Sequence, residues 1–169
     1  MIKQLTLGIV LVMWGPYLFA QEQNSPLDFR IGSWRVSWET PQGITVTGNA
    51  NISRVVGGKV IQELIYEVTG GEMAGFEVMN LAQHNVLEGK WYMTWVDSQG
   101  GYMSFVSEGT DNPPVFTRKV SRGPRAALFQ RIRYEVISPQ EWIWRLENSR
   151  DEGKTWQLMW EMQYLKLGN

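Results

Sequence analysis

The acidic side chains within the predicted strands are the first candidates for chemistry. Two carboxylates held close together in a cleft can act as general acid and general base, as they do in glycoside hydrolysis. The strand carboxylates are Glu63, Glu67, Glu77, Asp97, Glu135, Glu147 and Glu161. The sequence does not show which of them approach each other, so no catalytic residue is assigned. A hydrolase or isomerase that uses Glu63 or Glu161 as its base is one hypothesis, and whether the protein is an enzyme stays open.

Arginines and tryptophans in the same strands favour ligand binding over catalysis. The strand arginines are Arg118, Arg131, Arg133 and Arg145. Arg131 and Arg133 are two residues apart and therefore share one face of a strand. Inside a barrel they would hold the acidic group of an amphipathic ligand through charge-assisted hydrogen bonds. Outside it they would pair with Glu135 and Glu147 across strands.

The predicted ligand site combines this arginine pair with tryptophans that either line a pocket or fill it. Its members are Trp34, Trp91, Trp95, Arg131, Arg133, Trp142, Trp144 and Trp160. The chain has one histidine, His84, which we place in a turn at residues 83–85, and it has no cysteine. One histidine without cysteine cannot build a zinc site. Walker and dinucleotide-binding fingerprints are absent, so we predict no metal and no cofactor.

Turn residues recur about every ten residues after residue 30 and divide the chain into strands. We predict strands at 33–39, 44–54, 59–69, 74–83, 90–97, 101–108, 115–121, 128–137, 141–148 and 155–165. Several alternate with period two; Trp91, Met93 and Trp95, for example, share one face. Short loops make neighbours antiparallel, and closure into a barrel removes exposed edges. We therefore predict an all-β fold, a single up-and-down antiparallel barrel of about ten strands.

The first twenty residues differ from the rest and have the layout of a secretory signal peptide. Lys3 is followed by a nearly uninterrupted apolar run from Leu5 to Phe19, and Ala20 precedes a polar stretch. The run is short for a bilayer span of about 20 residues. We predict a signal peptide at 1–20, a lead-in at 21–30 with a helical turn near residues 26–29 at one barrel end, and a barrel domain at 31–167. The protein would then be periplasmic or secreted, without a stable membrane span after cleavage.

The formal net charge is −1, and no strongly basic run occurs. Nucleic-acid binding depends on neutralising phosphates with clustered lysine and arginine, so it is not expected. The sequence leaves the oligomeric state open, and a homodimer is one option.

Two short motifs mark the ends of the barrel. Ser149-x-Asp151-x-Gly153-x-Thr155-Trp156 has the form of an Asp-box, a hairpin whose serine and aspartate side chains bind turn amides. Sialidase propellers repeat this motif in each blade, but here it occurs once in a short chain, which favours a structural role. At the other end, Gly32-x-Trp34 is expected to let the chain enter the barrel and to lay an indole across its base.

These motifs and their separation resemble the DUF1579 family of uncharacterised bacterial exported proteins. The matching residues are Leu27-Asp28-Phe29, Gly32, Trp34, Trp144, Ser149, Asp151, Gly153, Thr155, Trp156, Trp160, Met162 and Tyr164. The resemblance implies a calycin-like, lipocalin-like barrel with a ligand-sized interior, and it implies no activity.

Three functions remain compatible with the sequence. The first is an exported lipocalin-like binding protein for a small apolar or amphipathic, and in one version acidic, ligand. The second is a packed structural barrel whose outer face or edge binds a partner. The third is the carboxylate-based enzyme. The orientation of residues 129–135 distinguishes among versions of the first, because the acid-binding site requires Arg131 and Arg133 to point inward.

Overall fold

The structure, a computed structural model, describes residues 25–121 and 128–168. The predicted signal peptide and the first residues of the predicted lead-in lie outside these ranges. Within them, no helix has the length and apolar character needed to cross a bilayer.

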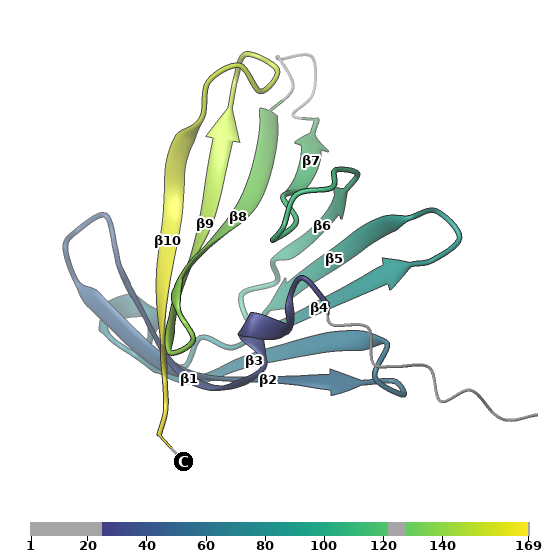
Figure 1. The fold of residues 1–169 in the computed structure, drawn as a ribbon. Helices are drawn as coiled ribbons and strands as arrows, with labels where there is room; N and C mark the ends of the chain where they lie inside the picture. Colours follow the sequence, from purple (N-terminus) through teal and green to yellow (C-terminus); the bar gives the residue numbers. More distant parts are fainter. Residues whose placement is uncertain (1–24, 122–127, 169) are drawn as a thin grey trace, which may run out of the picture.

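Ten antiparallel strands follow one another along the chain and close into a barrel (Figure 1). They are β1 (Gly32–Glu39), β2 (Thr45–Val55), β3 (Val60–Thr69), β4 (Val78–Asn85), β5 (Lys90–Asp97), β6 (Tyr102–Ser107), β7 (Phe116–Val120), β8 (Leu128–Ser138), β9 (Glu141–Ser149) and β10 (Gln157–Lys166). Each strand pairs with the next, and β1 pairs with β10. The predicted all-β, up-and-down barrel is confirmed.

The prediction for the fourth strand was wrong at both of its ends. A short 3₁₀ helix, η2 (Gly71–Met73), occupies the chain before β4, so the strand starts at Val78 and not at residue 74. His84 lies inside β4 and not in a turn. The turn follows at residues 86–89, where the side-chain oxygen of Asn85 accepts hydrogen bonds from the next backbone amides.

A second 3₁₀ helix, η1 (Asp28–Arg30), lies at the barrel end where β1 begins, which we call the plugged end (Figure 1). Leu27 before it is fully buried. Gly32 then turns the chain into β1 with φ +137°, a backbone conformation that side chains rarely tolerate. The indole of Trp34 is fully buried and donates a hydrogen bond to the Arg30 carbonyl at 2.7 Å. The predicted helical turn and the Gly-x-Trp entry are both present.

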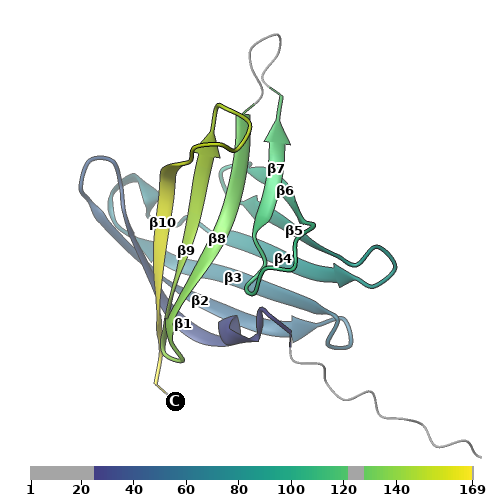
Figure 2. The ribbon, with the colours of Figure 1, turned by 45° about the horizontal axis from the view of Figure 1, so that its top comes forward.

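The opposite end of the barrel, which we call the far end, carries the loops 40–44, 70–77, 98–101 and 150–156. Here β6 and β7 diverge (Figure 2). They share a single residue pair, Val106 with Thr117. Among the described residues, the first half of β6 pairs only with β5, and the last residues of β7 pair only with β8. The barrel is therefore most weakly closed at this seam.

The loop between β9 and β10 is the Asp-box, and its contacts are structural. The Ser149 hydroxyl accepts a hydrogen bond from the Gly153 amide at 2.8 Å. The Asp151 carboxylate accepts from the Thr155 hydroxyl at 2.6 Å and from its amide at 2.9 Å. These bonds, with a further one from Ser149, hold the pKa of Asp151 well below its usual range. Trp156 closes the loop through its Nε1, which donates to the Gly153 carbonyl.

Candidate functional site

The six tryptophans of the predicted site all lie at inward-facing strand positions, but they do not form one cluster. Trp34 and Trp142 meet edge to face at the plugged end, where Trp142 also stacks on Tyr164 with ring centroids 3.7 Å apart. Further along the barrel, Trp95, Trp144 and Trp160 contact one another at centroid distances of 5.5–5.7 Å. Trp91 lies apart from both groups, half-buried, with its ring 5.3 Å from that of His84.

Burial separates the tryptophans that fill the interior from those that border open space. Trp34 and Trp142 expose none of their surface, and Trp95 and Trp144 at most 2%. A side chain without accessible surface borders no space large enough for a water molecule. The plugged end is therefore packed, as the filling interpretation predicted. Trp91 and Trp160 are half-buried and could still contact a ligand.

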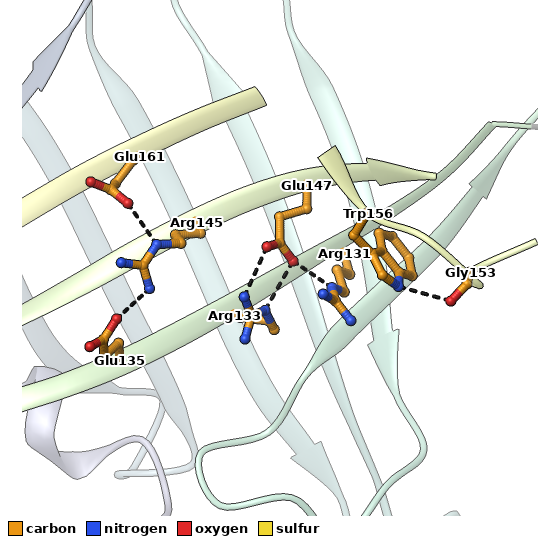
Figure 3. Close-up of polar contacts among 8 residues, drawn as sticks. All are labelled: Arg131, Arg133, Glu135, Arg145, Glu147, Gly153, Trp156 and Glu161. Carbon is orange, nitrogen blue, oxygen red and sulfur yellow. Dashed lines mark hydrogen bonds and ion pairs between the residues drawn. The ribbon is translucent and has the colours of Figure 1, made fainter. Parts of the chain in front are cut away.

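Arg131 and Arg133 lie on the outer face of β8, where they point toward Glu147 of β9 (Figure 3). Both bind the carboxylate of Glu147 on the neighbouring strand, and the Arg133 contacts measure 2.9 Å. These bonds, first those from Arg133 and then those from Arg131, lower the pKa of Glu147 despite its burial. The inward positions of β8 are taken by Ile132 and Tyr134. The version of the ligand site in which Arg131 or Arg133 points into the barrel is thus wrong.

A second outer ion-pair group involves Arg145, which pairs with Glu135 and Glu161 across the strands on either side (Figure 3). Arg131 also covers the Trp156 ring, its guanidinium 4.2 Å from the ring centroid. Of the two alternatives for the strand arginines, the structure therefore shows cross-strand pairing on the outer face for Arg131, Arg133 and Arg145. Glu161, one of the candidate catalytic bases, is exposed and ion-paired within this group.

The other candidate base, Glu63, lies in a buried polar cluster at the plugged end. Arg30 Nη2 contacts Glu63 Oε2 at 2.6 Å, and the two side chains are 1% and 3% exposed. The Tyr164 hydroxyl donates to the other carboxylate oxygen at 2.8 Å. Burial, with the neighbouring charge of Glu63, raises the pKa of Tyr164 well above its ordinary value. Both oxygens of Glu63 are therefore occupied by protein groups, which leaves it poorly placed to take a proton from a substrate.

The remaining guanidinium nitrogens of Arg30 have aromatic neighbours. Nε and Nη1 have no hydrogen-bond partner among the described residues. The guanidinium carbon lies 5.1 Å from the Tyr134 ring centroid and 5.7 Å from that of Trp142, within cation–π range. Burial raises the pKa of Tyr134 to about 12. The charge of Arg30 is thus balanced inside the protein, and this cluster anchors η1 to β3.

Arg118, at an inward position of β7, has no counter-charge among the described residues. Its Nε donates to the Gln130 side-chain oxygen at 2.6 Å, and the Gln130 amide donates to Asn148 at 2.8 Å. The guanidinium lies 4.9 Å from the centroid of the inward-facing Phe105 ring. No carboxylate of the described residues forms an ion pair with Arg118, and burial lowers its pKa.

Five other inward side chains toward the far end, on the strands from β6 to β10, are only partly buried, whereas Val46 and Val68, near the far ends of β2 and β3, are buried. The five are Met103, Val120, Leu128, Asn148 and Trp160. They come from β6, β7, β8, β9 and β10, and β6 and β7 flank the weak seam. Among the described residues, this part of the far end thus combines apolar side chains, the Trp160 indole, neutral hydrogen-bonding groups and an arginine without an ion-pair partner. Within residues 25–121 and 128–168, no group of three or more potential ligands could hold a metal ion.

The chain matches no protein-family model and no curated protein sequence. It is similar to solved structures of designed proteins. One is a de novo designed fluorescence-activating β-barrel, 9% identical, with a TM-score of 0.47 and coverage of 85% of this chain and 99% of that one. Another is a redesigned barrel, mFAP1, bound to DFHBI, 11% identical, with a TM-score of 0.43 and coverage of 85% and 100%. At these values the likeness carries no argument about what this chain binds.

Proposed function

We propose that the protein is an exported binding protein for a small amphipathic molecule with an acidic head group, held at the far end of the barrel. The single observation that carries this proposal is Arg118, an inward-facing arginine whose only hydrogen-bond partner among the described side chains is neutral. A bound carboxylate or sulfonate would supply the missing negative charge. It would also restore the pKa of Arg118, which burial lowers.

The surroundings of Arg118 support the amphipathic character of the ligand. An apolar tail would contact Met103, Leu128 and Trp160, which are half-buried and border accessible space. Gln130 and Asn148 hold the guanidinium in place, which reduces the entropy lost when an anion binds. The plugged end offers no comparable place, because its side chains are packed and its arginine is already paired.

Export is part of the proposal and rests on the signal-peptide layout of residues 1–20. Membership of the DUF1579 family stays a prediction from the motifs.

The test compares two ligands of equal chain length, laurate and dodecanol, by titration of tryptophan fluorescence. We expect laurate to bind more tightly, because only laurate carries a charge for Arg118. The variant Arg118→Gln should weaken laurate binding about tenfold, the lower part of the range for a charge-assisted hydrogen bond at a partly solvated site. Dodecanol binding should change little.

Arg133→Gln is the matched control, since it removes an arginine from the outer face of the adjacent strand. It should leave laurate affinity unchanged. The proposal fails if laurate does not bind, if Arg118→Gln binds laurate as tightly as the unaltered protein, or if Arg133→Gln weakens laurate as much as Arg118→Gln does.

A further inference from the structure

The outer surface of the barrel is divided into two unlike faces. On β8, β9 and β10 the outward positions carry the ion-paired arginines and glutamates of Figure 3. On β3, β4, β5 and β6 most outward positions carry no charge, and the charged exceptions, Glu67 and Lys90, lie near strand ends. Twelve of the uncharged positions form what we call the uncharged face: Gln62, Leu64, Tyr66, Met79, Leu81, Gln83, Tyr92, Thr94, Val96, Tyr102, Ser104 and Val106.

The apolar side chains of this face lie next to one another on the sheet. The strand register places Leu64 beside Met79, Met79 beside Val96, and Val96 beside Tyr102, so that one apolar row crosses all four strands. Each of these side chains is exposed, Leu64 and Val96 by 37% and Tyr102 by 67%. With a strand spacing of about 4.8 Å and about 6.7 Å between outward residues, twelve positions cover roughly 400 Å² of flat sheet. Eight of the twelve positions carry an aliphatic side chain, methionine or tyrosine, and an exposed patch dominated by such side chains often marks an interaction site.

The uncharged face is not flat. A hollow of about 380 Å³ is lined by Leu64, Tyr66, Met79 and Val96 of this face and also by the acidic residues Glu77 and Asp97. Tyr102, the most exposed side chain of the apolar row, is the register partner of Val96 and therefore projects beside the hollow. A protrusion and a hollow thus lie next to each other on one surface.

We propose that the uncharged face is the interface through which two copies of this chain associate. In a two-fold symmetric dimer both copies contribute the same surface, so charges of one sign in that surface would face charges of the same sign on the other copy. The twelve uncharged positions avoid both repulsion and the burial of unpaired ions, and the nearest charges are those of Glu77 and Asp97 in the hollow. Two-fold symmetry would also let Tyr102 of each copy enter the hollow of the other.

The composition of the face fits a protein partner better than the alternatives. The cores of protein–protein interfaces are enriched in tyrosine and methionine and depleted of lysine, glutamate and aspartate. The uncharged face has Tyr66, Tyr92, Tyr102 and Met79 and none of the depleted types. It also lacks the basic side chains that would draw it to anionic lipid or to nucleic acid. Because the area is small for an obligate dimer, we expect a dissociation constant on the order of micromolar.

The first test is the mass of the purified protein in solution, measured by sedimentation velocity at loading concentrations up to about 100 µM, well above the expected dissociation constant. The unaltered chain should shift from one-chain to two-chain mass as concentration rises. Met79→Lys, with a side chain 39% exposed on β4, should remove the dimer, because a symmetric interface would then bury two like charges. Leu165→Lys is the matched control at 43% exposure on β10, and it should dimerise as the unaltered chain does.

The second test locates the contact directly. The chain contains no cysteine, so one introduced cysteine gives a single spin label. A label at Ser104→Cys, on the uncharged face, should show dipolar broadening from the second copy. A label at Ser33→Cys, on the outer face of β1, should not.

Several results would overturn the proposal. They are a one-chain mass at every concentration, a dimer that survives Met79→Lys, or a dimer that Leu165→Lys removes. A fourth is a one-chain mass together with binding to phosphatidylcholine vesicles that Met79→Lys abolishes, which would assign the face to lipid. None of these results depends on Arg118, so the dimer and the proposed ligand site stand or fall separately.

Discussion

Removing one member of the buried pair of Arg30 and Glu63 should destabilise the barrel more than removing one member of any other ion pair in the described structure. The side chains of Arg30 and Glu63 are 1% and 3% exposed, whereas the other ion pairs each include a side chain exposed by 24% or more. The substitution Glu63→Gln keeps the shape of the side chain and removes its charge. Arg30 is then left as a cation with no counter-charge in a packed interior.

Leaving one member of a buried ion pair uncompensated typically costs about 3–5 kcal/mol. A domain of this size has a free energy of unfolding of about 5–15 kcal/mol, so the loss is a large share of the total. The Tyr164 hydroxyl, 2.8 Å from Glu63, can donate to the glutamine oxygen as it does to the carboxylate, and the rings around Arg30 still face its cation. These retained contacts put the expected loss at the lower end, about 3 kcal/mol.

Urea unfolding followed by tryptophan fluorescence measures this loss. The control is Glu161→Gln, which breaks an outer pair with a carboxylate 44% exposed and should cost at most about 1 kcal/mol. Arg30→Met combined with Glu63→Leu removes both charges and should recover much of the stability that Glu63→Gln loses. If Glu63→Gln costs no more than Glu161→Gln, the view that Arg30 is held as a buried, compensated cation is refuted.

Three further predictions concern single features of the fold. Gly32→Ala should lower the free energy of unfolding by about 1–3 kcal/mol in urea titrations, because φ +137° is strained for any side chain. Burial raises the folded-state pKa values of Tyr134 and Tyr164, so the stability that the two neutral hydroxyls contribute is complete below pH 10 and should be lost as pH rises further. Tyrosinate absorbance and unfolding midpoints measured against pH check this. In the variant Tyr164→Phe the unfolding midpoint should fall less steeply with pH. Asp151→Asn should lower the melting temperature measured by circular dichroism, because the amide cannot accept both bonds from Thr155 as well as a carboxylate does; an unchanged value would contradict this.

The number and order of strands could be predicted because each strand carries its own period-two pattern and each turn its own Gly, Asn or Pro. The start of β4 could not be predicted. The segment that contains η2 is held by a hydrogen bond from the Gly75 amide to the Val68 carbonyl, and no local sequence pattern indicates this bond. The faces of β8 were also ambiguous. Arg131 and Arg133 alternate with Ile132 and Tyr134, and the sequence alone does not say that the second pair faces the core.

Glu63 and Arg118 were named from the sequence without being placed on the inward face, although the sequence carries a signal for that orientation. Glu63 lies two residues from Ile61 and from Ile65 in the same strand, and Arg118 lies two residues from Phe116 and from Val120. A charged side chain whose neighbours two positions away are both apolar shares the inward face with them. What this pattern cannot supply is the partner. Glu63 meets an arginine from η1, far away in sequence, whereas Arg118 meets only neutral groups.

That difference in partners distinguishes the buried ion pair from the proposed ligand site. Arg30 and Arg118 are both removed from water to some extent, and a cation in that position requires compensation. At the plugged end the compensation is built into the chain, and the surrounding side chains leave no accessible space. At the far end no carboxylate of the described residues pairs with Arg118, several inward side chains of β6 to β10 are only partly buried, and the seam between β6 and β7 has one residue pair. A fold that stabilised both ends alike would have placed a carboxylate near Arg118, as it placed Glu63 near Arg30, so the asymmetry itself favours an external anion at the far end.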